Sequence, residues 1–192
     1  MIRYKSPAKL NLFLNIINKR NDGYHNIQSV FHLIDLFDYL IFSPREDNKI
    51  IFKSNVKKLE KNNLVVESLD LLRKAYQVKK FGMNIELIKN IPMGQGLGGG
   101  SSNAATTLNA LSRIWNLIIP KKDLISLALN LGSDIPFFLN ARNAWIEGRG
   151  DKIKPCYINI NKELLFLLVA PPFSISTKRA YKNIKKYLEP NF

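Results

Sequence analysis

The sequence is poor in cysteine: Cys156 is the only one in 192 residues. A single thiol cannot form an internal disulfide, which excludes a small disulfide-stabilised secreted domain and favours a reducing compartment. The chain also lacks an apolar run close to the roughly 20 residues that cross a bilayer, and its first residues do not follow a signal-peptide pattern. We therefore expect a cytoplasmic protein with no membrane partner.

Acidic residues are scarce relative to basic ones. Lys and Arg number 29 against 15 Asp and Glu, for a formal net charge of +14. Such an excess suits nucleic acid or an acidic lipid surface, but the basic residues are spread along the chain, without a long basic block. The spread argues against a nucleic-acid partner, while a basic surface would still attract a substrate that carries phosphates.

Hydrophobic periodicity predicts an α+β fold in which strands precede and alternate with helices. Strands are expected at 9–16, 27–42 (one or two), 49–55, 81–92 and 163–172 (buried), with a strand and hairpin at 144–155. Helices are expected at 63–77, from Ser101 or Ser102 to Trp115, at 121–132 and at 176–188. In the first strand, the leucines at 10, 12 and 14 alternate with Lys9 and Asn11, which indicates a half-buried strand whose two polar residues point the same way.

Glycine is rare except in one stretch, because five of the ten glycines fall within residues 94–100. A strand precedes this stretch and a helix follows it, which is a typical arrangement for binding phosphate on backbone N–H groups at a helix N-terminus. A flexible linker or a tight turn is the plainer alternative. A Walker A loop is excluded because no lysine follows Gly100, and a dinucleotide fingerprint is disfavoured because residues 104–122 contain no acidic residue.

The segment "PMGQGLGGGSSNAA" at 92–105 resembles the glycine-rich motif of the GHMP small-molecule kinases. Three further blocks, "SPAKLNLFL" at 6–14, "DGYHNIQS" at 22–29 and "LGSDIPFF" at 131–138, are similar to one branch of that family. Members of this branch phosphorylate the 2-hydroxyl of a cytidine-diphosphate sugar alcohol in isoprenoid-precursor synthesis. The resemblance implies a ribosomal-protein-like α+β domain that uses ATP with Mg²⁺.

The resemblance also implies roles for individual residues. Lys9 and Asp134 would be the catalytic pair, with Asp134 orienting or deprotonating the acceptor hydroxyl and Lys9 neutralising charge on the attacking oxygen. Tyr24 would stack on the cytosine, His25 would bond to its edge, Tyr181 would cover its other side, and Asn11 would contact the sugar alcohol. The residues expected to hold ATP are Asn63, Leu64, Val65, Pro92, Met93, Gly94, Gln95, Gly96, Leu97, Gly98, Gly99, Gly100, Ser101 and Ser102.

Plainer interpretations of the same residues remain open at this point. Asp134 precedes Ile135-Pro136 and could simply cap a short helix, and Lys9 could be one more surface lysine among 21. Tyr24 and His25 could be exposed turn residues, and Tyr181 also fits the apolar stripe of its own helix. No cluster of carboxylates marks a protein metal site, so Mg²⁺ would be held mainly by phosphate, with Ser101 or Ser102 as possible ligands.

The resemblance divides the chain into an ATP-binding domain at 1–155 and the incomplete start of a second domain at 156–192. The second part is too short to bury a core by itself, so we expect a fragment, a truncated product, or a chain that needs a partner such as a second copy. We expect weak ATP binding and poor turnover. The alternatives are a GHMP kinase with another acceptor, such as homoserine or mevalonate, and a chain that only binds.

Overall fold

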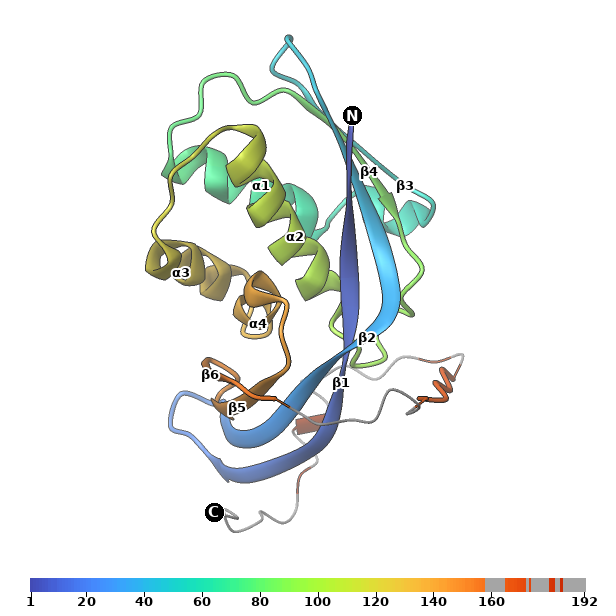
Figure 1. Cartoon of the computed structure of the whole chain (residues 1–192), viewed down its shortest axis with the longest axis vertical. Helices are drawn as coiled ribbons and strands as arrows, with labels where there is room; N and C mark the ends of the chain where they lie inside the picture. The colour runs from blue at the N-terminus through green and yellow to red at the C-terminus, as the bar shows by residue number, and fades with distance from the viewer. Residues whose placement is uncertain (158–164, 172, 174–179, 182–183, 185–192) are drawn as a thin grey trace.

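The two longest strands of the sheet are antiparallel neighbours. The computed structural model describes residues 1–157, 165–171, 173, 180–181 and 184. Strand β1 (Ile2–Lys19) pairs with β2 (His25–Pro44) from end to end, and the pair runs along most of the molecule (Figure 1). Gly23, with φ +84°, lies in the turn that joins them. The region 27–42 is therefore one strand rather than two.

The other edge of β2 serves two shorter strands. Residues 39–44 of β2 pair with β4 (Met83–Ile88), and residues 27–31 pair with β5 (Ala144–Gly148), both antiparallel. Strand β3 (Ile50–Ser54) extends the sheet parallel to β4, and β6 (Lys152–Pro155) forms the expected hairpin with β5. Each half of β2 thus supports a different part of the molecule.

The helices gather on one side of the sheet (Figure 1). A 3₁₀ turn, η1 (Lys57–Glu60), leads into α1 (Leu64–Ala75), and three more helices follow β4: α2 (Gly99–Ile114), α3 (Lys121–Leu131) and α4 (Ile135–Asn140). This arrangement confirms the predicted α+β class. None of the helices in the described part of the chain combines the length and the apolar character that a bilayer crossing demands.

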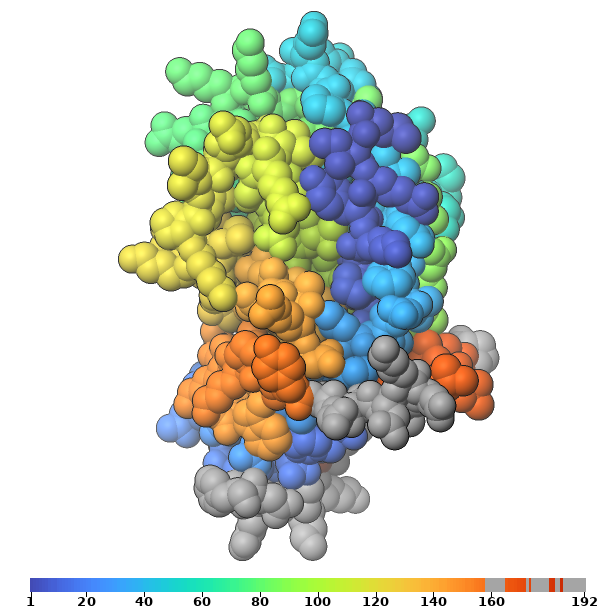
Figure 2. Space-filling view, viewed as in Figure 1, coloured from blue at the N-terminus to red at the C-terminus, as the bar shows by residue number. Residues whose placement is uncertain are grey.

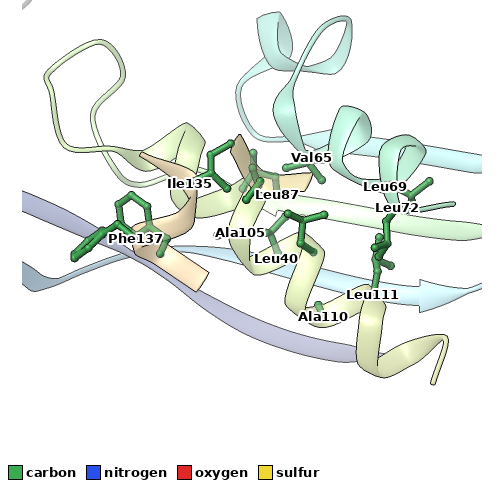
Figure 3. Packing of buried hydrophobic residues seen from close by; sticks show 14 of the residues in the cluster. Leu40, Val65, Leu69, Leu72, Leu87, Ala105, Ala110, Leu111, Ile135 and Phe137 are labelled. Carbon is green, nitrogen blue, oxygen red and sulfur yellow. The ribbon is translucent and has the colours of Figure 1, made fainter. Parts of the chain in front are cut away.

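The main core lies between the helices and the inner face of the sheet. Leu40 of β2 and Leu87 of β4 meet Leu69 of α1 and Leu111 of α2, and all four are fully or almost fully buried (Figure 3). Burying each such side chain contributes roughly 1.5–3 kcal/mol relative to exposure. The helices pack against the sheet without a gap in this view, and β1 lies at the surface along one side (Figure 2).

Helix α2 begins earlier than the sequence analysis expects. Its N-cap is Gly98, in the left-handed conformation at φ +69°, and not Ser101 or Ser102. Ser102 cannot serve as the cap, because its hydroxyl is buried and accepts a hydrogen bond from Ser6 Oγ at 2.8 Å. A glycine at the N-cap lets the loop turn sharply into the helix without a Cβ in the way.

Two burial expectations are wrong. In β1 the leucines Leu12 and Leu14 are each 39% exposed, while Lys9 is buried with 4% exposure. The register shifts between Asn11 and Leu14, and the side of β1 that carries Lys9 faces the loop and helices. Residues 165–170 do not form the expected buried strand: no described strand pairs with them, and Leu165 is 90% exposed. Residues 163–164 and 172 of that strand lie outside the described residues, as does most of the helix expected at 176–188.

Candidate active site

One large cavity contains most of the residues that the sequence analysis selects. Its volume is about 1820 Å³, whereas a site for one small molecule usually occupies roughly 300–1,000 Å³. The start of α1 and loop 92–100 line one end, and the β1–β2 turn and the tip of the β5–β6 hairpin line the other. The space is sufficient for two ligands side by side.

The glycine loop has the backbone geometry that only glycine adopts easily. Gly94, Gly96 and Gly98 all have positive φ, at 70°, 74° and 69°. A Cβ on Gly98 would lie 2.7 Å from Phe138 Cζ and 3.2 Å from Lys9 Cγ, whereas a Cβ on Gly96 would meet nothing within 4 Å. The loop therefore packs tightly against the protein at Gly98 and borders open space at Gly96. That open space, in front of a helix N-terminus, suits a bulky anion.

Lys9 is fixed from several directions at the centre of the cavity. Its ammonium donates to Asn11 Oδ1 at 2.7 Å and lies over the ring of Phe31, 4.2 Å from the centroid. Its backbone N–H donates to the carbonyl of Leu97 in the glycine loop, at 3.0 Å. Burial lowers the pKa of Lys9, and the nearby Asp134 carboxylate partly opposes that shift. A lysine held in this way is not one more surface lysine.

Asp134 faces Lys9 across the cavity. The distance from Lys9 Nζ to Asp134 Oδ2 is 3.9 Å, which is too long for a direct hydrogen bond. The side chain of Asp134 makes no capping hydrogen bond to α4, although the residue stands at the N-cap position. With 38% exposure, it is open to the cavity. The ammonium and the carboxylate can therefore both reach a third oxygen placed between them.

The opposite end of the cavity carries aromatic and basic groups. Tyr24 is 52% exposed, and the guanidinium of Arg149 lies 5.5 Å from its ring centroid. His25 packs against Tyr181, with ring centroids 5.1 Å apart. Burial raises the pKa of Tyr181, and the charge of Asp134 raises it further. Tyr181 therefore packs on His25, within the electrostatic influence of Asp134.

The start of α1 forms the far wall behind the glycine loop. Asn63 caps this helix: its Oδ1 accepts the N–H of Val66 at 3.0 Å, and its Nδ2 donates to the carbonyl of Leu59 at 2.8 Å. Leu64 Cδ1 lies 3.7 Å from the position that a Cβ of Gly100 would take. Val65 lines the cavity floor but is otherwise a core residue. Leu64 and Val65 bring an apolar surface to the loop, and Asn63 fixes the start of the helix that carries them.

The two loop serines have different environments. Ser101 lines the cavity, while the hydroxyl of Ser102 is bonded to Ser6 inside the protein and does not face the cavity. The side chain of Gln95 reaches outward, where its Nε2 donates to the carbonyls of Pro171 and Phe173 at 3.1 and 2.9 Å. Gln95 thus ties the loop to the segment after β6.

The structure adds four residues that the sequence analysis misses. Asp38, Lys89 and Asn103 form a buried polar group under the loop, and Arg149 lies at the tip of the β5–β6 hairpin. A signal for Asp38 was present. It is two residues from Leu40 and four from Phe42, so it shares the apolar face of the expected strand, where a buried charge needs partners. Arg149 had only the weak signal of its two flanking glycines.

Among the described residues, no three side chains of His, Cys, Asp or Glu come together as a metal-binding group. The donor set on the cavity wall consists mainly of hydroxyl, amide and ammonium groups, with two carboxylates, Asp22 and Asp134. A divalent cation here would take its oxygen ligands mostly from a bound anion, with Ser101 as the hydroxyl that the glycine loop offers to the cavity.

Comparisons with known proteins point to one family. The profile of the GHMP kinases N terminal domain matches residues 63–142. A 4-diphosphocytidyl-2-C-methyl-D-erythritol kinase of Acinetobacter baylyi is 46% identical over 181 residues, which cover 93% of this chain and 63% of that protein. The corresponding kinase of Francisella philomiragia is 44% identical over 181 residues, with 94% of this chain and 65% of that protein covered.

A solved structure gives the same result. The crystal structure of a 4-(cytidine 5'-diphospho)-2C-methyl-D-erythritol kinase superposes with a TM-score of 0.71 at 36% identity, over 81% of this chain and 55% of that one. The chain thus spans a little under two thirds of the length of the curated relatives it matches. The sequence blocks, the fold and these relatives agree that the chain carries the N-terminal domain of the GHMP kinases.

Proposed function

We propose that the chain carries the nucleotide site and the catalytic pair of a kinase that transfers the γ-phosphoryl group of ATP to the 2-hydroxyl of 4-diphosphocytidyl-2-C-methyl-D-erythritol. The observation that carries the proposal is the position of Lys9. Its ammonium lies 3.9 Å from the Asp134 carboxylate, and its backbone N–H is bonded to the glycine loop. Relatives that are named for this activity support the choice of acceptor.

The residues of this chain fit a nucleotide with its phosphates. The open side of Gly96 and the start of α2 leave room for an anion against backbone N–H groups, and Leu64 and Val65, next to Asn63, offer an apolar wall for a base. ATP, when bound, supplies the phosphoryl group. Mg²⁺ would be held mainly by the phosphate oxygens, with Ser101 on the protein side, and would offset their charge.

Lys9 and Asp134 would act on the acceptor hydroxyl. A hydroxyl between them would donate its hydrogen bond to Asp134 and receive one from Lys9. As the oxygen attacks phosphorus, its proton passes to the Asp134 carboxylate, while the ammonium stabilises the charge that develops on the oxygen. Lys9 begins in the required orientation because Asn11 and Phe31 hold it there.

The aromatic end would choose the acceptor. Tyr24 offers an exposed ring on which a cytosine could stack, and the ring pair of His25 and Tyr181 lines the same cavity. Asn11 is bonded to Lys9 and lines the cavity, which suits a contact with the sugar alcohol. Acceptors without a base, such as homoserine or mevalonate, would leave this surface unused.

The domain organisation and location belong to the same proposal. Residues 1–155 would form the ATP-binding domain, which agrees with the end of β6 at Pro155, and 156–192 would begin a second one. A reducing cytoplasm suits the single Cys156. Partners other than the two small molecules, including a second copy of the chain, have no specific support in the described contacts.

ADP release in a single-turnover assay tests the function. The chain, in excess over ATP, is mixed with Mg²⁺ and 4-diphosphocytidyl-2-C-methyl-D-erythritol, homoserine or mevalonate. We expect acceptor-dependent release only with the first, at a rate below the roughly 1–100 per second of ordinary small-molecule kinases. Release that is equal for the three acceptors would contradict the choice of acceptor, and failure to bind ATP would contradict the function itself.

A further inference from the structure

A fully buried carboxylate lies beneath the glycine loop. Asp38 of β2 accepts four hydrogen bonds, two on each oxygen. Its Oδ1 accepts the backbone N–H groups of Asn90 and Ile91, both at 2.8 Å. Its Oδ2 accepts Asn103 Nδ2 at 2.9 Å and the ammonium of Lys89. Every bond comes from a residue within three positions of loop 92–100.

These four bonds join the two ends of the loop. Asn90 and Ile91 come directly before Pro92, where the loop begins, and Asn103 lies in the first turns of the helix that follows it. One carboxylate therefore holds the entry and the exit of residues 92–100 at a set separation. The loop conformation, with its three positive φ values, depends on that separation.

The same network reaches the strand of the catalytic lysine. Asn103 Nδ2 also donates to Ser6 Oγ at 3.0 Å, and Ser6 Oγ donates to Ser102 Oγ at 2.8 Å. Ser6 is on β1, three residues before Lys9, whose own N–H is bonded to the loop carbonyl of Leu97. The loop and β1 are thus joined at both Ser6 and Lys9.

The positively charged member of this network, Lys89, lies beside the first residue of α2. Its Nζ lies 2.7 Å from the position that a Cβ of Gly99, the first residue of α2, would occupy. Without Asp38, this ammonium would be a nearly buried charge with no partner. Burying a charged pair rarely adds stability compared with apolar residues, so a geometric role explains its presence better than a stabilising one.

We propose that Asp38 is a positioning residue for the nucleotide phosphates. It holds both ends of loop 92–100, so that the loop amides point into the cavity at a set distance from Lys9. The proposal rests on the proposed function, because it assigns the loop to phosphate binding. It predicts that loss of Asp38 weakens binding in proportion to the number of phosphates on the ligand.

Calorimetric titration of an Asp38→Asn variant with ATP, ADP, AMP and adenosine tests this prediction. In either orientation of its amide, asparagine turns an NH2 group toward two of the four donors that the carboxylate accepts. We expect binding of ATP to weaken roughly tenfold or more and that of adenosine to change by less than about twofold. The control is Leu111→Ala, which removes core volume at the far end of α2 and should leave the ratio of ATP to adenosine affinity unchanged.

A milder variant serves if Asp38→Asn does not fold. Asn103→Ala removes the bonds to Asp38 and Ser6 but leaves the other bonds of Asp38, and should weaken ATP binding roughly threefold, again more than adenosine binding. Equal losses for all four ligands, or no loss in either folded variant, would overturn the proposal.

A ligand-free measurement separates this proposal from the proposed function. The amide of Ser102 is bonded to the carbonyl of Gly98, and that of Lys9 to Leu97, so both report on the loop without contacting Asp38. We expect their hydrogen exchange to be faster in Asp38→Asn or Asn103→Ala than in Leu111→Ala. If the unmodified chain binds no ATP, the proposed function fails, and unchanged protection of these two amides would then overturn the role of Asp38.

Discussion

The two ends of the cavity are built differently. At the glycine-loop end, Asp38 and Lys9 are buried, and bonds to β1, β2 and α2 hold the loop in place. At the other end, Tyr24 on the β1–β2 turn is 52% exposed and the side chain of Arg149 at the β5–β6 hairpin tip is 34% exposed. The first end is preorganised for one shape of ligand, while the second can adjust to its ligand.

This contrast follows from what each end would have to recognise. Phosphate groups are bound by many backbone amides at once, which must be aligned in advance to be effective. A base and a sugar are recognised by a few side chains, which can settle around them on binding. The five predictions below break or sharpen this contrast, from the largest expected effect to the smallest.

Asp134→Asn should have the largest effect on turnover. The amide cannot take the acceptor proton, so we expect single-turnover ADP release to slow by about 10²–10⁴-fold. Because Asp134 is not part of the glycine loop and makes no capping bond, ATP affinity should change little, and the start of α4 should be unaffected. Parallel rate and titration measurements check this. A chain that only binds would show no change in either, as would a nucleic-acid-binding module.

Gly98→Ala should damage the preorganised end most. Its Cβ would overlap Phe138 and press on Lys9, at a cost of about 1–3 kcal/mol from overpacking, and the positive φ adds about 1–2 kcal/mol. Urea unfolding measures the loss. Gly96→Ala is the matched control, because its φ is similar but its Cβ meets no protein atom. It should lose stability only through φ, yet it should still weaken ATP binding by occupying the open space.

Tyr24→Leu should affect only the adjustable end. Loss of a stacked base costs about 1–3 kcal/mol, so titration with 4-diphosphocytidyl-2-C-methyl-D-erythritol should show weaker binding by that amount, with ATP affinity unchanged. Tyr24→Phe retains the ring and should behave as the unmodified chain does. An equal effect of the two substitutions would mean that the hydroxyl, rather than the ring face, contacts the acceptor.

The lowered pKa of Lys9 has opposite consequences for rate and stability. As pH rises through that pKa, the ammonium is lost and the rate should fall by up to about tenfold per pH unit. The unfolded chain binds this proton more tightly, so the free energy of unfolding should rise between the lowered pKa and about 10.4.

Burial also lowers the pKa of Lys89, although its bond to Asp38 opposes that shift. Both lysines therefore affect how stability changes at alkaline pH. The contribution of Lys9 alone is the difference between the unmodified chain and Lys9→Met in urea unfolding at several pH values. A Lys9→Met variant with the same alkaline slope as the unmodified chain would contradict the shift.

Asp47→Asn should have the smallest effect, since it lies on the β2–β3 connection, away from both ends. Its hydrogen bond with Arg45 lowers the pKa of Asp47 to about 2, so its contribution is present above the unfolded value of about 3.9 and is lost as pH falls toward 2. The pair is exposed, so thermal unfolding at neutral pH should move only slightly. A change in ATP or acceptor binding would contradict the separation of this region from the site.

Periodicity and turn chemistry made much of the fold predictable. The helix beginning near Asn63, the hairpin at 144–155 and the strand–glycine loop–helix unit could all be read from local sequence, because spacing and glycine placement act over a few residues. The start of α2 could not, since the serine that looked like a cap, Ser102, instead bonds to Ser6, a residue that is distant in sequence. The run 165–170 was misread because apolar composition alone does not provide a strand partner.

The sequence by itself determined the family, the glycine loop and the choice of Lys9 and Asp134, because these lie in short blocks whose residue types reflect their chemistry. Only the tertiary structure decided that Lys9 of β1 is buried while Leu12 and Leu14 are partly exposed, and that Asp38 joins the two ends of the loop. The physical reason is that burial and hydrogen-bond partners are properties of contacts between distant segments. Alternation along one strand specifies two faces, but it does not specify which of them the rest of the chain will cover.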